Sequence, residues 1–360
     1  MRRGALDFDD LVRGALSALE TDPELCTRWR ERCEALLVDE VQDVDRSQLR
    51  LALYLAAPGN RIFLVGDDDQ TIYAWRLADV RRILDLASSL PGLRRVDLVT
   101  NYRCPSIVVD RAVRLVEHNS ERFAKTIRPR PSAPGRLFLL ADPGDDVARA
   151  RRLLRGWAVP DGGTRAILAR TNAELAPYAA VALETGTPYR AAEDGLLLDD
   201  PAIDEVLHVV SGAAGAAPLL EGLLRARASA RTAHGVAAAA LLAWAPPYGD
   251  APALAAAVAE TRTRRAAIRR DDAPLLLATA HGTKGLEFDH VAVVGMDEGR
   301  FPSRRSVEES DNPERTLEGE RRLAYVAWTR ARRSLTLVYD PDAPSPFLEE
   351  AFSGAELRNG

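Results

Sequence analysis

Two clusters of acidic residues each follow a short apolar run, a placement that suits the hydrolysis of a nucleoside triphosphate. In the first cluster, Asp39 and Glu40 follow residues 35–38. Such hydrolysis needs one carboxylate to hold Mg²⁺ and a second group to orient the attacking water. Adjacent acids at the end of a strand can supply both, because alternate side chains point in different directions. The alternative is that the two acids end a strand by facing solvent.

The second cluster lies in residues 66–76, where an amide, two aromatic rings and a cation follow three acids. The amide of Gln70 could hydrogen-bond a terminal phosphate or its attacking water. Tyr73, Trp75 and Arg76 suit the binding of unpaired bases and their backbone, at about 1–3 kcal/mol per stacked base. The alternative is that the aromatic rings anchor a helix in the core.

Two further segments carry arginines suited to phosphoryl transfer. In residues 100–103, Arg103 could neutralise charge that develops on a transferred phosphoryl group, and Tyr102 could stack on a base. Residues 320–331 predict an amphipathic helix with Arg330 late in it. Each arginine has the alternative of a surface charge or an ion pair.

Residues 279–287 form a fifth segment, which contains two glycines. Because glycine has no side chain, Gly282 and Gly285 permit close approach of the backbone to a phosphate or a sugar.

Short apolar runs predict the strands that position these residues. Residues 35–38 and 61–66 are wholly apolar or nearly so, which is typical of strands buried on both faces of a parallel sheet under helices. Functional loops in such sheets lie at the carboxyl ends of the strands, where both acid clusters occur. Upstream, residues 7–35 show helical spacing that is interrupted near Pro23.

A second α/β unit follows a linker. Residues 128–136 contain three prolines and a glycine, which break any helix. Residues 202–270 are rich in alanine and predict a helical insertion. The strands predicted for this unit are residues 137–140, 166–169, 275–278, 290–294 and 335–339.

Composition indicates a soluble cytoplasmic protein. The 360 residues carry a net charge of −5, so any binding to nucleic acid must come from a local groove. The three cysteines have no metal-ligand spacing, which favours a reducing compartment. The first ten residues turn acidic before a signal peptide could form, and no apolar stretch approaches the length of a membrane span.

Taken in order, the five segments resemble motifs II to VI of the UvrD/Rep/PcrA group of superfamily 1 DNA helicases. The resemblance runs from residue 7 to about residue 352, except near 202–270. Because the motifs follow one another in register, their joint signal is stronger than that of any one motif. Three shorter segments also match the group: residues 7–11, 167–172 and 346–350.

The resemblance implies roles in ATP hydrolysis for five side chains. Asp39 would help to coordinate Mg²⁺, and Glu40 would activate the hydrolytic water. Gln70 would sense the γ-phosphate. Arg103 and Arg330 would be the two arginine fingers.

It also implies roles in binding the nucleotide. Tyr102 would pack against the base, Lys284 would approach the phosphates, and Glu287 would approach the ribose. Gly285 lies between Lys284 and Glu287 in the same nucleotide-binding segment.

Single-stranded DNA is the expected partner of a further set. Tyr73, Trp75 and Arg76 would hold the strand. Thr279 and His281 would lie in the segment that couples DNA to nucleotide.

The implied fold has two RecA-like lobes, each a parallel sheet flanked by helices, which close on ATP and move 3′ to 5′ along one DNA strand in repair or recombination. Residues 1–130 would form an incomplete first lobe. Residues 131–201 and 271–352 would form the second lobe, with residues 202–270 as a short helical insertion.

One departure from the group concerns the phosphate-binding loop G-x-x-x-x-G-K-[ST]. The chain has only two lysines, Lys125 and Lys284, and neither lies in such a loop. The expectation is a chain that starts within the first lobe and hydrolyses little ATP alone, because the loop lies on a separate upstream polypeptide or is missing from a truncated gene model. The alternatives are a non-catalytic module that binds single-stranded DNA or a partner and, disfavoured by the ordered motifs, an unrelated α/β NTP-binding protein.

Overall fold

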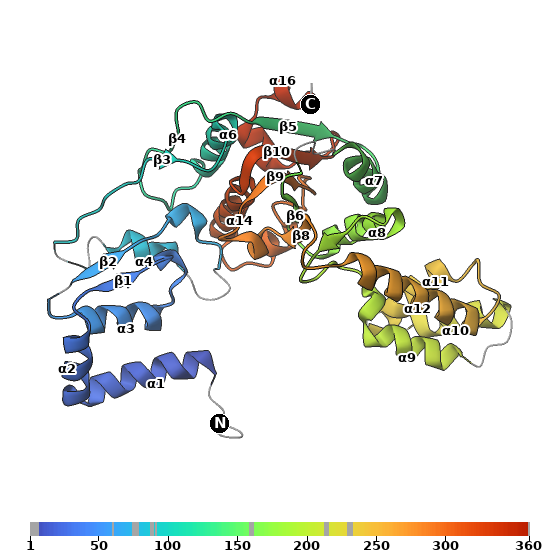
Figure 1. Ribbon diagram of the computed structural model, residues 1–360, viewed down its shortest axis with the longest axis horizontal. Helices are drawn as coiled ribbons and strands as arrows, with labels where there is room; N and C mark the ends of the chain where they lie inside the picture. The colour runs from blue at the N-terminus through green and yellow to red at the C-terminus, as the bar shows by residue number, and fades with distance from the viewer. Residues whose placement is uncertain are drawn as a thin grey trace. The chain divides into compact units, whose positions relative to one another are not determined.

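The computed structural model describes residues 7–59, 61–73, 79–86, 90, 92–157, 162–211, 216–228 and 233–358 (Figure 1). Contacts divide the chain into two compact units. The first unit comprises Met1–Ala141, Thr283–Glu287 and Met296–Gly360, and the second comprises Asp142–Gly282 and Phe288–Gly295.

The first unit opens with two helices that meet at a proline. The side chain of Asp7 accepts a hydrogen bond from the backbone of Asp10 and begins α1 (Phe8–Thr21). Asp22 caps α2 (Pro23–Arg32), in which Pro23 takes the first position, where its missing N–H costs nothing. The predicted interruption of the helix is therefore confirmed.

The two acid clusters follow a pair of parallel strands, β1 (Leu36–Val38) and β2 (Ile62–Leu64). One face of this pair packs against a small core that contains Ile83. The other face is open, because Leu37 is 73% exposed and Phe63 is 63% exposed. The prediction that both faces of these strands are buried is wrong, since only one face has covering residues in the described part of the chain. The adjoining elements are η1 (Val41–Asp43), α3 (Arg46–Ala56), η2 (Asp68–Gln70) and α4 (Val80–Leu84).

The remainder of the first unit contains two more parallel pairs. β3 (Thr100–Asn101) pairs with β4 (Arg128–Pro129), inside the stretch predicted to be a linker. β5 (Arg136–Ala141) pairs with β10 (Ala331–Tyr339) over six residues. The helices of this part are α6 (Ser106–Val116), α13 (Arg304–Glu308), α14 (Pro313–Trp328), α15 (Pro346–Ala351) and α16 (Gly354–Arg358).

Helix α14 differs from the sequence prediction. All of its residues from Glu320 to Trp328 are buried, so this part of the helix is not amphipathic. The helix ends at Trp328 with Thr329 as its cap, and Arg330 lies just beyond it. The charged side chains of this stretch are buried because carboxylates and carbonyl groups pair with them, as Glu350 does with Arg321.

The second unit has four parallel strands in the order β9-β6-β8-β7. Strand β6 is mostly buried, and each residue of β8 is buried or half-buried, as their apolar sequences predict. Its elements are β6 (Arg165–Ala169), β7 (Tyr189–Arg190), β8 (Leu275–Thr279), β9 (Phe288–Val293), α7 (Asp146–Gly156), α8 (Ala176–Thr185), η4 (Ala173–Leu175) and η5 (Leu197–Asp199), and η6 (His281–Thr283) runs from its end into the first unit.

Four helices of the second unit form the predicted helical insertion and lie together in Figure 1. They share a core of alanine, leucine and valine side chains. They are α9 (Pro201–Val210), α10 (Ala216–Arg227), α11 (Ala233–Trp244) and α12 (Ala251–Ile268).

The predicted fold class, a mixed α/β chain of parallel strands flanked by helices, is confirmed. The domain boundaries drawn from the motifs stay a prediction. No helix among the described residues is both long and apolar enough to span a bilayer.

Candidate functional site

The first acid pair follows β1 directly. Glu40 has a left-handed backbone, with φ 51° and ψ 40°, and its N–H donates to Asp39 Oδ1 over 2.8 Å. A residue other than glycine held in this region costs about 1–3 kcal/mol, a strain that clusters at functional sites. The side-chain amide of Gln42, which is buried, donates to the Glu40 carboxylate. The carboxylate is thus held by both its backbone and a buried neighbour.

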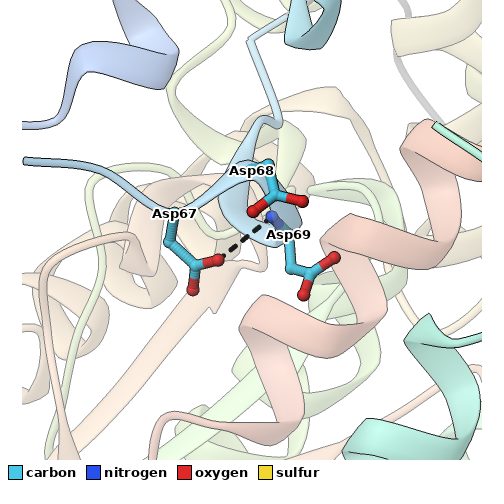
Figure 2. A group of neighbouring side chains, drawn as sticks. All are labelled: Asp67, Asp68 and Asp69. Carbon is cyan, nitrogen blue, oxygen red and sulfur yellow. Dashed lines mark hydrogen bonds between the residues drawn. The ribbon is translucent and has the colours of Figure 1, made fainter. Parts of the chain in front are cut away.

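The second acid cluster follows β2 and already binds a cation of the chain. The carboxylates of Asp67, Asp68 and Asp69 offer oxygens within 4.8 Å of one another, as metal ligands do (Figure 2). The ammonium group of Lys125 contacts all three, at 2.6 Å from Asp67, 3.0 Å from Asp69 and closely at Asp68. These oxygens therefore bind a cation of the chain itself rather than presenting a free site.

The pKa values of this cluster move in opposite directions. Burial raises the pKa of Asp68, and the charge of Asp69 adds to the effect. Burial also acts to raise the pKa of Asp67, but the attraction of Lys125 outweighs it, so that this pKa is lowered. Burial acts to lower the pKa of Lys125, and the three carboxylates more than reverse it. Lys125 therefore stays charged at neutral pH.

Gln70 is held between the two acid clusters. Its Nε2 donates to Asp67 Oδ2 over 2.8 Å, and its backbone carbonyl accepts from Lys284 Nζ over 2.8 Å. Gln70, the proposed sensor, thus contacts Lys284 through its backbone carbonyl. Its side-chain amide is linked to Lys125 through Asp67.

Lys284 is the cation of the first acid cluster. Its Nζ lies 2.6 Å from Asp43 Oδ2 and 3.6 Å from Glu40 Oε2. It also lies 5.4 Å from the centre of the Tyr73 ring, a cation–π contact. Burial raises the pKa of Asp43 even though Lys284 acts to lower it. The ammonium thus stands where a cation bound by these acids would be placed.

The two predicted arginine fingers lie beside each other. Arg103 Nε donates to Glu287 over 2.8 Å, and its NH1 donates to the carbonyl of Thr329 over 3.4 Å. Arg330, 1% exposed, donates to the carbonyls of Val326 and Leu286.

Burial and neighbouring charges shift the pKa values of Arg330 and Glu287. Burial and then the charge of Arg103 lower the pKa of Arg330 to about 10, which leaves it charged at neutral pH. The hydrogen bond from Arg103 lowers the pKa of Glu287. Within the described residues no carboxylate pairs with Arg330. Two adjacent guanidinium groups with one carboxylate suit the binding of an anion such as a phosphoryl group.

Residues 283–287 join the two groups of side chains. Lys284 reaches the acids and Gln70, while Leu286 and Glu287 reach Arg330 and Arg103. Gly285 has φ +81°, a conformation that favours glycine and turns the chain between them.

Tyr102, Thr279 and His281 are the other predicted residues that the structure describes. Tyr102 follows β3 and is 75% exposed, with room to stack on a planar ligand. Thr279, which ends β8, and His281, in η6, belong to the second unit. Trp75 and Arg76 lie outside the described residues.

Sequence reasoning assigned no role to three residues of the site: Gln42, Asp43 and Lys125. Gln42 and Asp43 stand two and three residues after Glu40, so they were visible within the motif. For Lys125 the signal was its rarity, since the chain has only one other lysine.

Comparison with known proteins identifies the class to which this arrangement belongs. Residues 1–91 match the UvrD/REP helicase N-terminal domain, and residues 255–341 match the UvrD-like helicase C-terminal domain. The chain belongs to the UvrD/Rep family of helicases.

The relatives include DNA helicase II of Salmonella typhimurium, which is 28% identical over 94% of this chain and 60% of its own length. UvrD2 of Mycobacterium bovis, named an ATP-dependent DNA helicase, is 31% identical over 92% of this chain and 51% of its own length. Rep of Escherichia coli is 26% identical over 92% of this chain and 64% of its own length. The chain thus spans about 51–64% of the length of these relatives.

A solved structure, the C-terminal domain of a possible DNA helicase from Lactobacillus plantarum, covers 70% of this chain and 95% of its own at 15% identity. The TM-score of this match is 0.32.

Proposed function

We propose that this chain is part of an ATP-dependent DNA helicase or translocase that moves 3′ to 5′ on single-stranded DNA in repair or recombination. The observation that carries the proposal is the segment 283–287, which links the acid pair and Gln70 to Arg103 and Arg330. Carboxylates, an amide, a lysine and two arginines are the groups that phosphoryl transfer to water requires. The family membership of the chain supports the same reaction.

The acidic side of the site would prepare the water. When bound, ATP with Mg²⁺ supplies the phosphoryl group that water accepts. Asp39, at the end of β1, would hold the metal ion, and Glu40 would take the proton of the water. Gln70 would orient that water through its side-chain amide. The hydrogen bond from the buried Gln42 would keep the Glu40 carboxylate in place, despite the strain of its left-handed backbone.

The basic side would stabilise the negative charge that develops. Arg103 and Arg330 have fixed directions, because each donates to carbonyl oxygens of the fold. Such fixed donors cost no reorganisation when the charge forms. Lys284 and Glu287 would exchange their present partners for phosphate and ribose oxygens. Tyr102, exposed beside Arg103, would cover the base.

Single-stranded DNA would lie on a separate set of residues. We assign the strand to Tyr73, Trp75 and Arg76, and its coupling to the nucleotide to Thr279 and His281. Aromatic rings bind bases without sequence preference, as a translocating protein needs. The cation–π contact of Tyr73 with Lys284 would couple that set to the acid cluster.

The residues of this chain fit the metal ion and the transferred group but not the phosphate chain of ATP, since no phosphate-binding loop occurs in the sequence. We infer that a polypeptide bearing this loop, separate or continuous with the chain, binds beside β2. In the parallel pairing Arg61 and Val65 bond to β1, so the backbone groups of Ile62 and Leu64 face the other edge.

The free edge of β2 can pair with another strand, and the open face beside it can be covered by further residues of the same polypeptide. No described strand pairs with β2 apart from β1. The apolar side chains of Leu37, Phe63 and Val65 are exposed there, and parallel sheets are otherwise covered on both faces. An added parallel strand would bring its carboxyl end to the acids, where a phosphate-binding loop is needed.

ATP hydrolysis by the purified chain tests the proposal. Alone, with or without single-stranded DNA, we expect negligible turnover. Addition of a polypeptide that carries the missing loop should give DNA-dependent turnover, and Glu40→Gln in this chain should abolish it. DNA-dependent turnover by the chain alone, lost in Glu40→Gln, would mean that the chain has its own phosphate site and that the inferred loop is not needed.

A second candidate is a module that binds single-stranded DNA without hydrolysis. The observation that favours it is the ion pair of Lys284 with Asp43, which occupies the acid cluster. This candidate would be supported if the chain binds single-stranded DNA but no ATP hydrolysis follows the addition of the loop-bearing polypeptide.

A further inference from the structure

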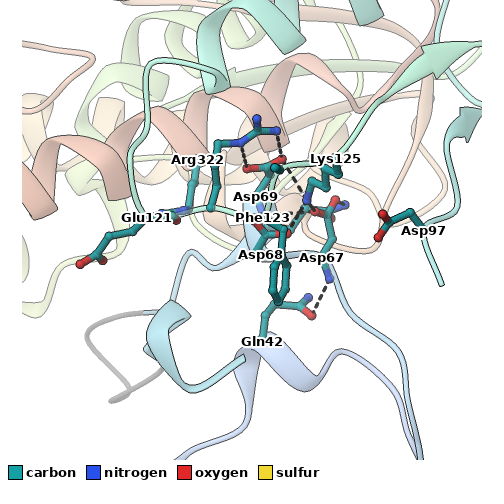
Figure 3. A network of polar contacts seen from close by, with 12 residues as sticks. Gln42, Asp67, Asp68, Asp69, Asp97, Glu121, Phe123, Lys125 and Arg322 are labelled. Carbon is teal, nitrogen blue, oxygen red and sulfur yellow. Dashed lines mark hydrogen bonds and ion pairs between the residues drawn. The ribbon is translucent and has the colours of Figure 1, made fainter. Parts of the chain in front are cut away.

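A continuous series of polar contacts runs from Lys125 to both Glu40 and Gln70. Figure 3 shows the part of it that contains Lys125, Asp67 and Gln42. Lys125 Nζ lies 2.6 Å from Asp67 Oδ1, and Asp67 Oδ2 accepts from Gln70 Nε2 over 2.8 Å. The backbone N–H of Asp67 donates to Gln42 Oε1 over 3.1 Å. Gln42 Nε2 in turn donates to the Glu40 carboxylate. One aspartate therefore fixes both groups that would act on the attacking water.

The orientation of Gln42 is set by close packing. Its side chain is 1% exposed, and a Cβ at Gly66 would lie 2.6 Å from its Oε1. The missing side chain of Gly66 thus leaves the space that the amide fills. Because the Gln42 Oε1 accepts from Asp67, its Nε2 must point to Glu40. The donors and acceptors of the series can therefore be arranged in only one way.

Lys125 balances the negative charge of Asp67 and its neighbours. Asp68 and Asp69 are its immediate neighbours in space, and like charges at this distance repel. Arg122 pairs with Asp69 through two hydrogen bonds of 3.0 and 2.8 Å, whereas Asp67 pairs with Lys125. Lys125 is therefore the cation that balances Asp67 among the described residues.

We propose that Lys125 is a positioning residue that fixes Asp67, and so holds Gln70 through the Asp67 carboxylate and Glu40 through the Asp67 backbone N–H and Gln42. Without its ammonium group, Asp67 would face two carboxylates and would turn away or take up a proton. Turning away breaks its hydrogen bond to Gln70, and protonation weakens that bond because a neutral carboxyl group is a poorer acceptor than a carboxylate. The importance of this positioning for hydrolysis rests on the proposed function, whereas the series of contacts can be tested in the chain alone.

The glutamines of the chain provide the measurement. The sequence has three, Gln42, Gln48 and Gln70, so nuclear magnetic resonance of chain labelled with ¹⁵N-glutamine shows three side-chain amides. We expect Lys125→Met to shift the signals of Gln42 and Gln70. The signals of Gln48 should stay in place, because its Oε1 accepts from the backbone of Asp45 in the cap of α3.

Two variants complete the experiment. Lys125→Arg keeps the positive charge and should restore the signals towards their original positions. Arg122→Met removes a cation of the same cluster that pairs with Asp69, and it should leave Gln70 unshifted. Unshifted Gln42 and Gln70 signals in Lys125→Met, or equal shifts in Arg122→Met, would overturn the proposal.

Circular dichroism checks that each variant is folded. If Lys125→Met does not fold, Lys125→Gln, which keeps a donor but not the charge, takes its place with the same expected shifts. In an assembly that hydrolyses ATP, Lys125→Met should lower kcat and leave the KM for ATP unchanged. Because the resonance experiment needs no turnover, a failure of the proposed function and a failure of this proposal give different results.

Discussion

The two lysines of the chain both bind carboxylates that follow a strand. Lys125 contacts the three acids after β2, and Lys284 contacts Asp43 and Glu40 after β1. Their distribution decides which oxygens can serve a metal ion. The acids after β2 pair with Lys125 and Arg122, whereas Asp39 accepts from the backbone N–H of Glu40 and has no ion pair among the described residues. The proposed metal site therefore lies in the first cluster, although the second has more carboxylates.

Gly66 provides a prediction at the scale of single residues. A Cβ there would lie 2.6 Å from Gln42 Oε1 and 2.7 Å from Val41 Cγ1. Overpacking of this kind costs about 1–3 kcal/mol, so Gly66→Ala should lower the free energy of unfolding by that amount in urea titrations. Gly14, inside α1, has no atom within 4 Å of the added carbon. Gly14→Ala should raise the free energy of unfolding by about 0.5–1 kcal/mol. Equal effects of the two changes would show that Gly66 is not packed against Gln42.

At the scale of elements, the apolar runs predicted most of the strands. β6, β8, β9 and β10 lie where these runs predicted them, because a buried parallel strand needs an almost unbroken apolar sequence. The end of the last long helix could not be placed: α14 ends at Trp328, and local sequence does not show that its charged residues find buried partners.

For the candidate site, too, the sequence predicts features that depend on local residues and misses those that depend on distant contacts. The order of the motifs predicted which side chains would be functional, and the structure brings Glu40, Gln70, Lys284, Arg103 and Arg330 into two linked groups. The role of Lys125 could not be predicted, since it depends on contacts between positions more than fifty residues apart.

The open face of β1 and β2 provides a prediction about an element. Phe63 is exposed, so Phe63→Lys should change the free energy of unfolding by no more than about 0.5 kcal/mol. The same change should reduce self-association, measured by sedimentation velocity, because exposed apolar patches promote it. Leu64, the next residue, packs on the buried core. Leu64→Lys should cost about 2 kcal/mol or more. If self-association is unchanged in Phe63→Lys, this face does not mediate contacts between copies of the chain.

At the scale of the whole chain, each unit contains a carboxylate whose pKa is lowered by a buried cation. In the first unit this is Asp67, as described above. In the second unit, Asp194 accepts from Arg265 at 2.8 and 3.0 Å and from the hydroxyl of Tyr189 at 2.7 Å. Burial acts to raise the pKa of Asp194, but these hydrogen bonds and the charge of Arg265 outweigh it, so its pKa lies below 3.8. Asp43 and Asp68, with raised pKa values, contribute with the opposite sign.

The dependence of stability on pH follows from these directions. A carboxyl group whose pKa is lower in the folded state contributes stability above its unfolded pKa, and the contribution is lost as the pH falls through the folded value. Asp194→Asn leaves the buried Arg265 without its main partner, which should cost about 3–5 kcal/mol at pH 7. The difference in the free energy of unfolding between the intact chain and this variant should shrink as the pH falls below 3.8.

Urea titrations of both chains at a series of pH values measure this difference. Asp271→Asn, at an exposed position of the same unit, is the matched control and should change the free energy of unfolding by no more than about 0.5 kcal/mol throughout. A difference for Asp194→Asn that stays constant down to low pH would mean that the variant loses packing rather than a charge pair. A difference that shrinks, with the control unchanged, would assign the loss to the ionised carboxylate, because only its contribution disappears when the carboxyl group takes up a proton.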